Sequence, residues 1–355
     1  MQGMRVVLIG LALIAAAGER ASAQERAQDY PSRQVNFIVP FAPGGGTDII
    51  GRRRLVGQKL SDRFGKPFVI ENRPGAGTVT AAVQVAKSAP DGYTIMMATS
   101  GTMAMNTTLY KTLPYHPGKD LLLVAVVANV PFVLVVNPAL PVNSVADLVK
   151  LAKERPLSYG SGGPGAFHHL MGELFKTTMG IPMTHVPYKG TLPALNDVIA
   201  GHIQLMFSDL APAYPLIEAG KVRALGVTTA QRVPAAPELP PLAEVGVPGF
   251  DWAAWQSVAA PGGTPKEIVA KLNGAVNAAV AEPEVSKQLV GLRFIPIGKG
   301  TPEELDPLRA VGDHALGEGA APGWRGGHGV SRQHARNFRM WGRAARKGPV
   351  YARQT

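Results

Sequence analysis

From about residue 30 onward, the chain alternates between two hydrophobic patterns. Short apolar runs rich in β-branched residues are typical of buried strands, and apolar residues spaced three and four apart are typical of helices. The runs predict strands at Val35–Phe41, Phe68–Glu71, Thr94–Ala98, Val124–Val127, Phe132–Val136, Ser158–Gly160, Thr184–Pro187, Ile203–Phe207 and Val222–Val227. The helical spacing predicts helices at Ile49–Leu60, Val79–Lys87, Val145–Lys153, Phe167–Met179, Ala194–Ala200, Tyr214–Ala219 and Lys266–Val280. This alternation predicts an α/β fold in which helices cover both faces of parallel sheets.

Two apolar stretches indicate how the chain is divided. Leu122–Val136 is almost entirely apolar, and Val222–Thr229 is a second such stretch. We interpret them as two long strands that cross between lobes, because about 280 residues are natural for two cores. The expected division is a signal peptide at 1–23, lobe one at 24–124 plus 228–305, lobe two at 125–227, and an atypical tail at 306–355.

Four loops rich in glycine or hydroxyl residues follow predicted strands. They are Pro43-Gly44-Gly45-Gly46, Pro74-Gly75-Ala76-Gly77, Thr99-Ser100-Gly101-Thr102 and Ser161-Gly162-Gly163-Pro164-Gly165. Open α/β sheets hold small ligands at the carboxyl ends of their strands, where unhindered N–H groups at helix N-termini attract a carboxylate or phosphate. Each loop alone is also typical of an ordinary strand-to-helix connection, with Asp48 capping the first helix. Together they support a binding site without identifying its ligand.

The N-terminus has the features of a cleavable secretion signal. Arg5 precedes the apolar run Val6–Ala17, which is too short to span a bilayer, and Ala21-Ser22-Ala23 fits the small-x-small cleavage rule. We therefore expect a periplasmic protein that begins at Gln24, with a membrane-anchored N-terminal helix as the alternative. The chain has no cysteine, which excludes disulfides and thiolate metal sites.

The formal net charge of +11 is unevenly distributed along the chain. Nine Lys and Arg against three acids give residues 306–355 a charge of +6, and residues 1–23 carry +1, which leaves +4 for residues 24–305. No basic stripe for nucleic acid is visible there, and the run Arg52-Arg53-Arg54 is interpreted as the solvated face of a helix.

The last 50 residues differ in composition from the rest. They contain nine glycines and eight arginines and have no sustained apolar period, although Thr301-Pro302-Glu303-Glu304-Leu305 resembles the start of a capped helix. This abrupt change favours a shifted reading frame. A genuine disordered basic tail is the alternative that composition leaves open.

Other kinds of chemistry have weaker support. Gly160–Gly165 fits G-x-G-x-x-G, but no acid follows about 20 residues later, and no P-loop is present. Neighbouring helical residues point about 100° apart, so His168 and His169 are interpreted as packed or surface residues and not as metal ligands with His185 and Asp209. Neither Ser100 nor Ser161 lies in a G-x-S-x-G elbow. We expect no catalytic residues, no metal and no cofactor.

The ordered motifs from about residue 30 to 305 resemble one family, the substrate-binding receptors of tripartite tricarboxylate transporters, also called Tct-type or Bug-type extracytoplasmic solute receptors. The resemblance is carried by Phe41-Ala42-Pro43-Gly44-Gly45-Gly46-Thr47-Asp48, Glu71-Asn72-Arg73-Pro74-Gly75-Ala76-Gly77, Ala89-Pro90-Asp91-Gly92-Tyr93-Thr94, the Ser161–Gly165 loop with His169-Leu170, His185-Val186-Pro187-Tyr188-Lys189-Gly190, Phe207-Ser208-Asp209, Gly220-Lys221-Val222-Arg223-Ala224-Leu225 and Ala260-Pro261-Gly262-Gly263-Thr264-Pro265. It implies a type II periplasmic-binding-protein fold, in which two doubly wound α/β lobes joined by crossing strands close on a small carboxylate like a Venus flytrap.

The resemblance also implies which residues bind the ligand. They are Pro43, Gly44, Gly45 and Asp48 in the first loop, Gly75, Ala76 and Gly77 in the second, Ser100 and Thr102 in the third, Ser161, Gly162 and Gly163 from the other lobe, and Tyr188 and Asp209 near the cleft. Position 78 is Thr where the family usually has Gly, which we expect to tighten the second loop.

The implied function is that of a monomeric receptor that delivers its carboxylate to the membrane subunits of a tripartite transporter, without a nucleic-acid partner. The alternative is a secreted α/β enzyme acting on a small organic acid. The sequence does not identify the carboxylate, since backbone N–H groups can donate to any carboxylate.

Overall fold

The computed structural model describes residues 28–52, 55–110 and 112–304, which form a two-part α/β molecule. The strands are β1 (Val35–Val39), β2 (Phe68–Asn72), β3 (Thr94–Thr99), β4 (Leu121–Val136), β5 (Leu157–Ser161), β6 (Met183–Pro187), β7 (Leu205–Asp209), β8 (Arg223–Val227), β9 (Ala253–Pro261) and β10 (Ile295–Pro296). The helices are α2 (Gly46–Gly51), α3 (Val56–Phe64), α4 (Val79–Ala86), α5 (Asn106–Leu109), α6 (Val145–Glu154), α7 (Phe167–Met179), α8 (Thr191–Ala200), α9 (Leu210–Glu218), α10 (Lys266–Ala281) and α11 (Pro283–Gly291), with short helical turns η1 (Ala76–Thr78) and η2 (Gly101–Met105).

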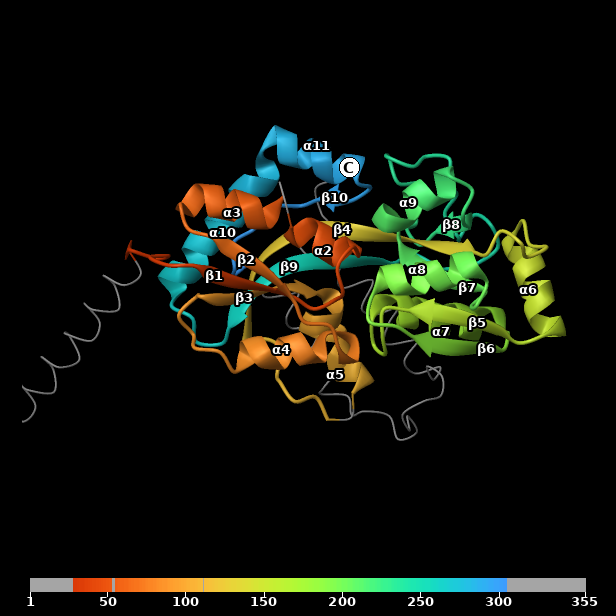
Figure 1. The fold of residues 1–355 in the computed structure, drawn as a ribbon, viewed down its shortest axis with the longest axis horizontal. Coiled ribbons are helices and arrows are strands. Elements are labelled where there is room, and N and C mark those ends of the chain that lie inside the picture. Colours follow the sequence, from red (N-terminus) through yellow and green to blue (C-terminus); the bar gives the residue numbers. More distant parts are fainter. Residues whose placement is uncertain (1–27, 53–54, 111, 305–355) are drawn as a thin grey trace, which may run out of the picture.

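Strand β4 belongs to both parts of the molecule. The strand order is β2-β1-β3-β9-β4-β7-β5-β6, and β8 and β10 also pair with β4. Residues 121–131 of β4 pair with β9, whereas residues 132–136 pair with β7 and β8. Figure 1 shows β4 and β9 running between the two parts, which we call the first half (β1, β2, β3, β9, β10) and the second half (β5, β6, β7, β8).

Both faces of the sheet are covered in each half, because its buried strands are apolar at successive positions. In β1, Phe37 and Val39 face a core shared with α3 and α10, while Ile38 faces a second core against α4. In β4, Leu134 joins the first of these cores and Val133 joins a third one beneath α8 and α9. The predicted α/β class with helices on both faces is thus confirmed.

The sequence pattern missed two strands and misplaced one crossing element. Strand β9, which lies between β3 and β4, was not predicted, and neither was β10. Val222–Thr229 was expected to be a long crossing strand, which is wrong. The structure instead has the five-residue β8, which pairs with β4 only at residues 133–136.

The helix predictions are mostly correct, with three differences. The expected helix Ile49–Leu60 is two helices, α2 and α3, because α2 ends at Gly51. Helices α5 and α11 were not predicted. No helix in the described part of the chain is long and apolar enough to cross a membrane. The expected signal peptide and the tail at 306–355 lie outside the described residues.

Candidate functional site

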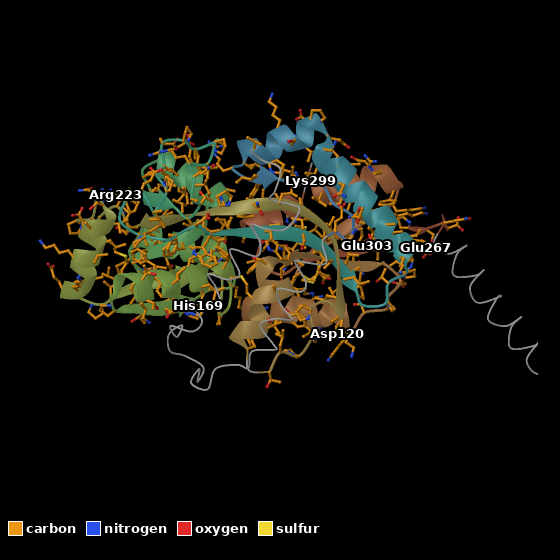
Figure 2. All side chains as sticks on the ribbon, turned by 180° about the vertical axis from the view of Figure 1, so that it is seen from behind. Asp120, His169, Arg223, Glu267, Lys299 and Glu303 are labelled. Carbon is orange, nitrogen blue, oxygen red and sulfur yellow. The ribbon has the colours of Figure 1, made fainter. Side chains whose placement is uncertain are left out.

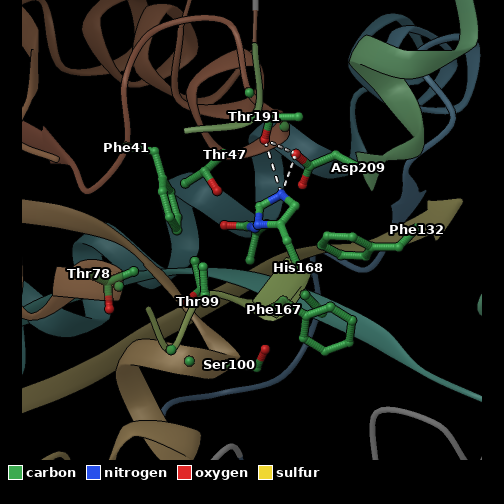
Figure 3. A pocket seen from close by; sticks show the side chains of 18 residues that line it. Phe41, Thr47, Thr78, Thr99, Ser100, Phe132, Phe167, His168, Thr191 and Asp209 are labelled. Atoms are coloured by element: carbon green, nitrogen blue, oxygen red, sulfur yellow. Dashed lines mark hydrogen bonds and ion pairs between the residues drawn. The ribbon is translucent and has the colours of Figure 1, made fainter. Parts of the chain in front are cut away.

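A narrow cavity lies between the two halves (Figure 3). Its lining residues are Phe41, Gly45, Gly46, Thr47, Gly77, Thr78, Thr99, Ser100, Gly101, Phe132, Gly165, Ala166, Phe167, His168, Thr191, Asp209, Ala254 and Gln256. Several come from loops that follow parallel strands, including β1, β3, β5 and β7. The carboxyl ends of parallel strands meet at one sheet edge, and this explains why residues so far apart in sequence converge.

The wall nearest the crossing strand is apolar. The rings of Phe132 and Phe167 pack with centroids 4.5 Å apart, and the ring of His168 meets Phe132 edge-on at 5.3 Å. Phe41 stands on another side of the same cavity in Figure 3. A ligand here would meet an apolar surface along much of its length and polar groups at only a few points.

One buried polar cluster joins α7, α8 and β7 within the cavity. His168 Nε2 lies 3.1 Å from Thr191 Oγ1 and 3.2 Å from Asp209 Oδ2, and the Thr191 hydroxyl donates to the same carboxylate. Because the Thr191 hydroxyl donates its hydrogen to Asp209, both Thr191 Oγ1 and Asp209 Oδ2 act as acceptors toward Nε2. His168 therefore carries a hydrogen on Nε2.

The Asp209 carboxylate stays charged although it is buried. Burial alone would raise its pKa, but attraction to His168 and hydrogen bonds from His168, Thr191 and the Gly46 N–H together hold the pKa below its ordinary value. The Gly46 contact comes from the first half and the other two from the second. The charge of Asp209 therefore links the two halves at the cavity.

Three buried polar atoms among the lining residues have no hydrogen-bond partner: Ser100 Oγ, His168 Nδ1 and Gln256 Oε1. Ser100 directly follows β3 and Gln256 lies in β9, both in the first half, and His168 comes from α7 in the second. Buried polar atoms in native proteins are nearly always paired, because leaving one unpaired costs about 1–3 kcal/mol. Their gathering at one cavity marks it as a place for a polar ligand.

The N-terminus of α7 adds further donors. Ala166 N–H is bonded to Gly163, and the helix's first internal bonds come from His169 and Leu170. The N–H groups of Phe167 and His168 therefore have no carbonyl within the helix to bond, and both residues line the cavity. The helix dipole makes this end favourable for a negatively charged group.

A threonine network supports the opposite wall. Thr102 Oγ1 donates to Thr78 Oγ1 at 3.0 Å and lies 3.3 Å from Thr99 Oγ1. Asn106 Nδ2 also donates to Thr78, and the Tyr115 hydroxyl donates to the Thr102 carbonyl. Thr78 and Thr99 line the cavity and Thr102 lies behind them, so Thr102 holds two lining residues without itself being one.

The two halves touch around the cavity. Ala42 N–H donates to Lys189 O at 3.1 Å, and the Tyr110 hydroxyl donates to Ala76 O at 2.8 Å and to Pro164 O at 3.2 Å. Gly77 approaches Pro164 so closely that a Cβ at Gly77 would lie 1.9 Å from the Pro164 oxygen. The rim of the cavity is therefore formed by both halves in contact.

Four of the expected ligand-binding residues line the cavity: Gly45, Gly77, Ser100 and Asp209. A Cβ at Gly45 would stand 3.1 Å from Thr191 Oγ1, a tight contact across the two halves. The remaining expected residues do not line the cavity.

In the first half, Pro43 is exposed, and a side chain at Gly44 would meet Leu192 across the rim. Asp48 accepts hydrogen bonds from Gly44 N–H, the Arg52 guanidinium and the Asn72 amide, so its carboxylate serves the fold of the loop.

The second loop of the first half contributes mainly backbone to the rim. Gly75 packs against Thr80, and Ala76 presents its carbonyl to Tyr110. Thr78 follows with a φ of +92°.

In the second half, Ser161, Gly162 and Gly163 lie behind the lining residues. Ser161 contacts His185, and Gly162 packs against the ring of His168. Tyr188 donates its hydroxyl to Asp197 at 2.5 Å and does not line the cavity.

Sequence reasoning missed most of the aromatic and polar wall: Phe41, Phe132, Phe167, His168, Thr191 and Gln256. The pair His168-His169 was noticed, but only the fold shows that His168 turns to the cavity while His169 turns to His185. Gln256 belongs to the strand that was not predicted. Within the described ranges, no group of three or more His, Cys, Asp or Glu is placed to hold a metal ion.

Comparison with known proteins gives consistent results. The profile of the family described as "Tripartite tricarboxylate transporter family receptor" matches residues 53–299. BugT of Bordetella pertussis is 35% identical over 295 residues, covering 82% of this chain and 89% of BugT.

Two solved structures are also similar. A protein of R. palustris, solved with adipate, is 40% identical with a TM-score of 0.76, covering 89% of this chain and 98% of that one. MatC from Rhodopseudomonas palustris, with bound malate, is 31% identical with a TM-score of 0.74, covering 81% of this chain and 100% of that one.

Proposed function

Since the chain belongs to the tripartite tricarboxylate transporter receptor family, of the Tct and Bug type, and has its two-lobed type II periplasmic-binding-protein fold, we propose that it captures a small carboxylate for transport. Like its relatives, it is a solute-binding receptor and not an enzyme. The expected family and fold are thus confirmed. The ligand, the transporter and the residues that bind are the subject of the proposal.

The observation that carries the proposal is the unpartnered Ser100 hydroxyl, which lines the same cavity as the N-terminus of α7. A carboxylate at the Ser100 end would accept from its hydroxyl and from the free N–H groups of α7, which come from opposite halves. No Lys or Arg stands among the cavity-lining residues of the described chain, so these uncharged donors and the α7 dipole would supply the attraction.

We also propose the division into lobe one (24–124 plus 228–305) and lobe two (125–227). In support, β4 changes its partners between Pro131 and Phe132, a few residues after the expected boundary. Bending of the crossing segments there would separate the rim contacts and open the cavity, as in hinge closure of other two-lobed binding proteins.

Location and partners are proposed from the same kinship. The chain would work as a monomer in the periplasm after removal of residues 1–23, and the ligand-bound form would dock on the membrane subunits of a tripartite tricarboxylate-type transporter. The similar proteins that contain adipate and malate support a small carboxylate as cargo.

Native mass spectrometry of the purified chain, followed by calorimetric titration with adipate and with malate, tests the proposal. Ser100→Ala should weaken binding of the carboxylate about 5–20-fold by removing one donor. Ser32→Ala, on the exposed side of the first half, is the matched control and should bind like wild type. Equal affinity of the two variants would refute the assigned site.

A further inference from the structure

Two histidines lie behind the loop that connects β5 to α7 in the second half. His169 is in the first turn of α7, and His185 is in β6. Their rings stack with centroids 4.0 Å apart, and Tyr159 of β5 stacks on His185 at 5.1 Å. Figure 2 shows His169 at the edge of the second half. Neither histidine lines the cavity.

Each ring holds one end of the loop Ser161–Gly165. Ser161 Oγ lies 2.6 Å from His185 Nε2, and Gly165 N–H donates to His169 Nδ1 at 3.1 Å. A backbone N–H can only donate, so Nδ1 of His169 must be an unprotonated acceptor. A proton on Nδ1 would place two hydrogens face to face and break this contact.

The same loop forms the rim that meets the first half. Pro164 O accepts a hydrogen bond from Tyr110 and lies against Gly77. The next residue of the loop, Gly165, lines the cavity. Gly165 has a φ of +78°, a conformation that side-chain-bearing residues rarely adopt. The Gly165 N–H belongs to the peptide unit whose carbonyl is Pro164 O. A hydrogen bond to this N–H therefore fixes the orientation of the rim carbonyl.

The surroundings keep both rings neutral. Burial lowers the pKa of His169, with Lys176 acting in the same direction and Glu173 opposing it. Burial, then His169, then Lys176 lower the pKa of His185 to about 3. Glu173 also accepts from Tyr159, and these groups together are the titratable neighbours in α7, β5 and β6.

We propose that His169 is a positioning residue for ligand capture: its Nδ1 lone pair, held in place by the stack on His185, fixes Gly165 and thereby the rim carbonyl of Pro164. The inference rests on the proposed function, because it assigns the loop a role in closing the cavity. It concerns a residue that does not contact the ligand space.

The sign of the pH dependence follows from the neutral state. The folded protein holds fewer protons on His169 than the unfolded chain, so its contribution is complete above pH 6.5 and declines as the pH falls below 6.5. The Gly165 contact itself persists until the pH reaches the lowered pKa.

Amide exchange at Gly165, measured by NMR on the whole chain without ligand, tests the proposal. His169→Leu should raise the Gly165 exchange rate about fivefold or more, because one hydrogen bond is lost. His169→Asn keeps a side-chain acceptor near the Nδ1 position and should restore slow exchange. His202→Leu, at an exposed histidine, is the control and should change nothing at Gly165.

A wild-type pH series gives a second readout that needs no variant. Gly165 protection should stay constant as the pH falls through 6.5 and be lost as the pH reaches the lowered pKa of His169, before the core amides of β5 exchange. Unchanged exchange in His169→Leu, or equal exchange in the Leu and Asn variants, would overturn the proposal. Titration with adipate and malate is separate: if wild type binds neither, the proposed cargo fails while the exchange result stands.

Discussion

His168 Nε2 lies 3.2 Å from Asp209 Oδ2, and this contact ties the first turn of α7 to the end of β7 inside the cavity. Both side chains are 5% exposed, so the pair is almost fully desolvated. A buried carboxylate that loses its partner is costly, whereas the intact pair is close to neutral in net stability. The pair is therefore better understood as orienting His168 Nδ1 than as a source of stability.

The first prediction concerns this pair. Asp209→Asn and His168→Leu should each lower the free energy of unfolding by about 2–4 kcal/mol, and the double variant should lose less than the sum. Urea denaturation of the four proteins measures the coupling. Strict additivity would show that the two side chains act independently.

The same pair predicts a pH dependence. The folded pKa of Asp209 lies below its ordinary 3.8, so its contribution to stability is present above pH 3.8 and is lost as the pH falls through the lowered value. The stability difference between wild type and Asp209→Asn should shrink in acid. A difference that stays constant down to the lowest pH at which both fold would contradict this.

The second prediction tests closure at the rim. Gly77→Ala places a Cβ 1.9 Å from Pro164 O, so the two halves must separate, and affinity for a bound carboxylate should fall about 100-fold or more. Small-angle scattering should show a larger radius of gyration. Gly65→Ala is the control, since Gly65 has a similar φ of +64° and nothing within 4 Å. It should cost about 1 kcal/mol in stability without changing affinity or size.

The third prediction concerns Tyr110. Tyr110→Phe removes a hydroxyl that bonds Ala76 O in the first half and Pro164 O in the second. Affinity for adipate or malate should fall about 3–10-fold with little change in melting temperature, because the contact is at the rim. Tyr93→Phe loses a hydroxyl that bonds exposed Ser32 and should keep full affinity. Equal losses in the two variants would rule out a specific role for Tyr110.

The fourth prediction compares two helix glycines. A Cβ at Gly172 in α7 would stand 2.2 Å from the Tyr159 ring, so Gly172→Ala should destabilise the protein by about 1–3 kcal/mol. Gly274 in α10 has nothing within 4 Å, so Gly274→Ala should stabilise it by about 0.5–1 kcal/mol. Thermal unfolding of both variants decides. Two shifts of the same sign would show that packing does not control them.

The strands found from sequence share a dense apolar character that β9 lacks. The segment Val35–Val39 can be recognised as a strand from its sequence, since β-branched side chains fit a buried pleated surface. Ala253–Pro261 is rich in alanine and contains Gln256 and Ser257, so it has no local strand signal. Its place comes from pairing with β3 and β4 on either side, which is information that a local pattern does not contain.

The part of the candidate site that is formed by backbone could be predicted from the sequence. Glycines after strands, such as Gly45 and Gly77, could be located because the ends of parallel strands converge. The side-chain wall could not, because spacing does not tell which of two adjacent histidines turns inward. Asp48 illustrates the opposite case: its position after a glycine loop fits binding and capping equally, and the structure shows it bonded to its own loop.

The sharing of β4 and β9 has a consequence for the order of assembly. The second half draws its strands from residues 132–227, a nearly continuous segment, whereas β3 is joined to β4 only through β9, at residues 253–261. A chain made from its N-terminus therefore has every strand of the second half before it can complete the first. Until β9 arrives, the apolar edge of β3 has no neighbour on that side and is open to pairing with other chains. The first half, which begins the chain, is thus the last to be completed. The protein most needs protection from aggregation before residue 261 has been synthesised.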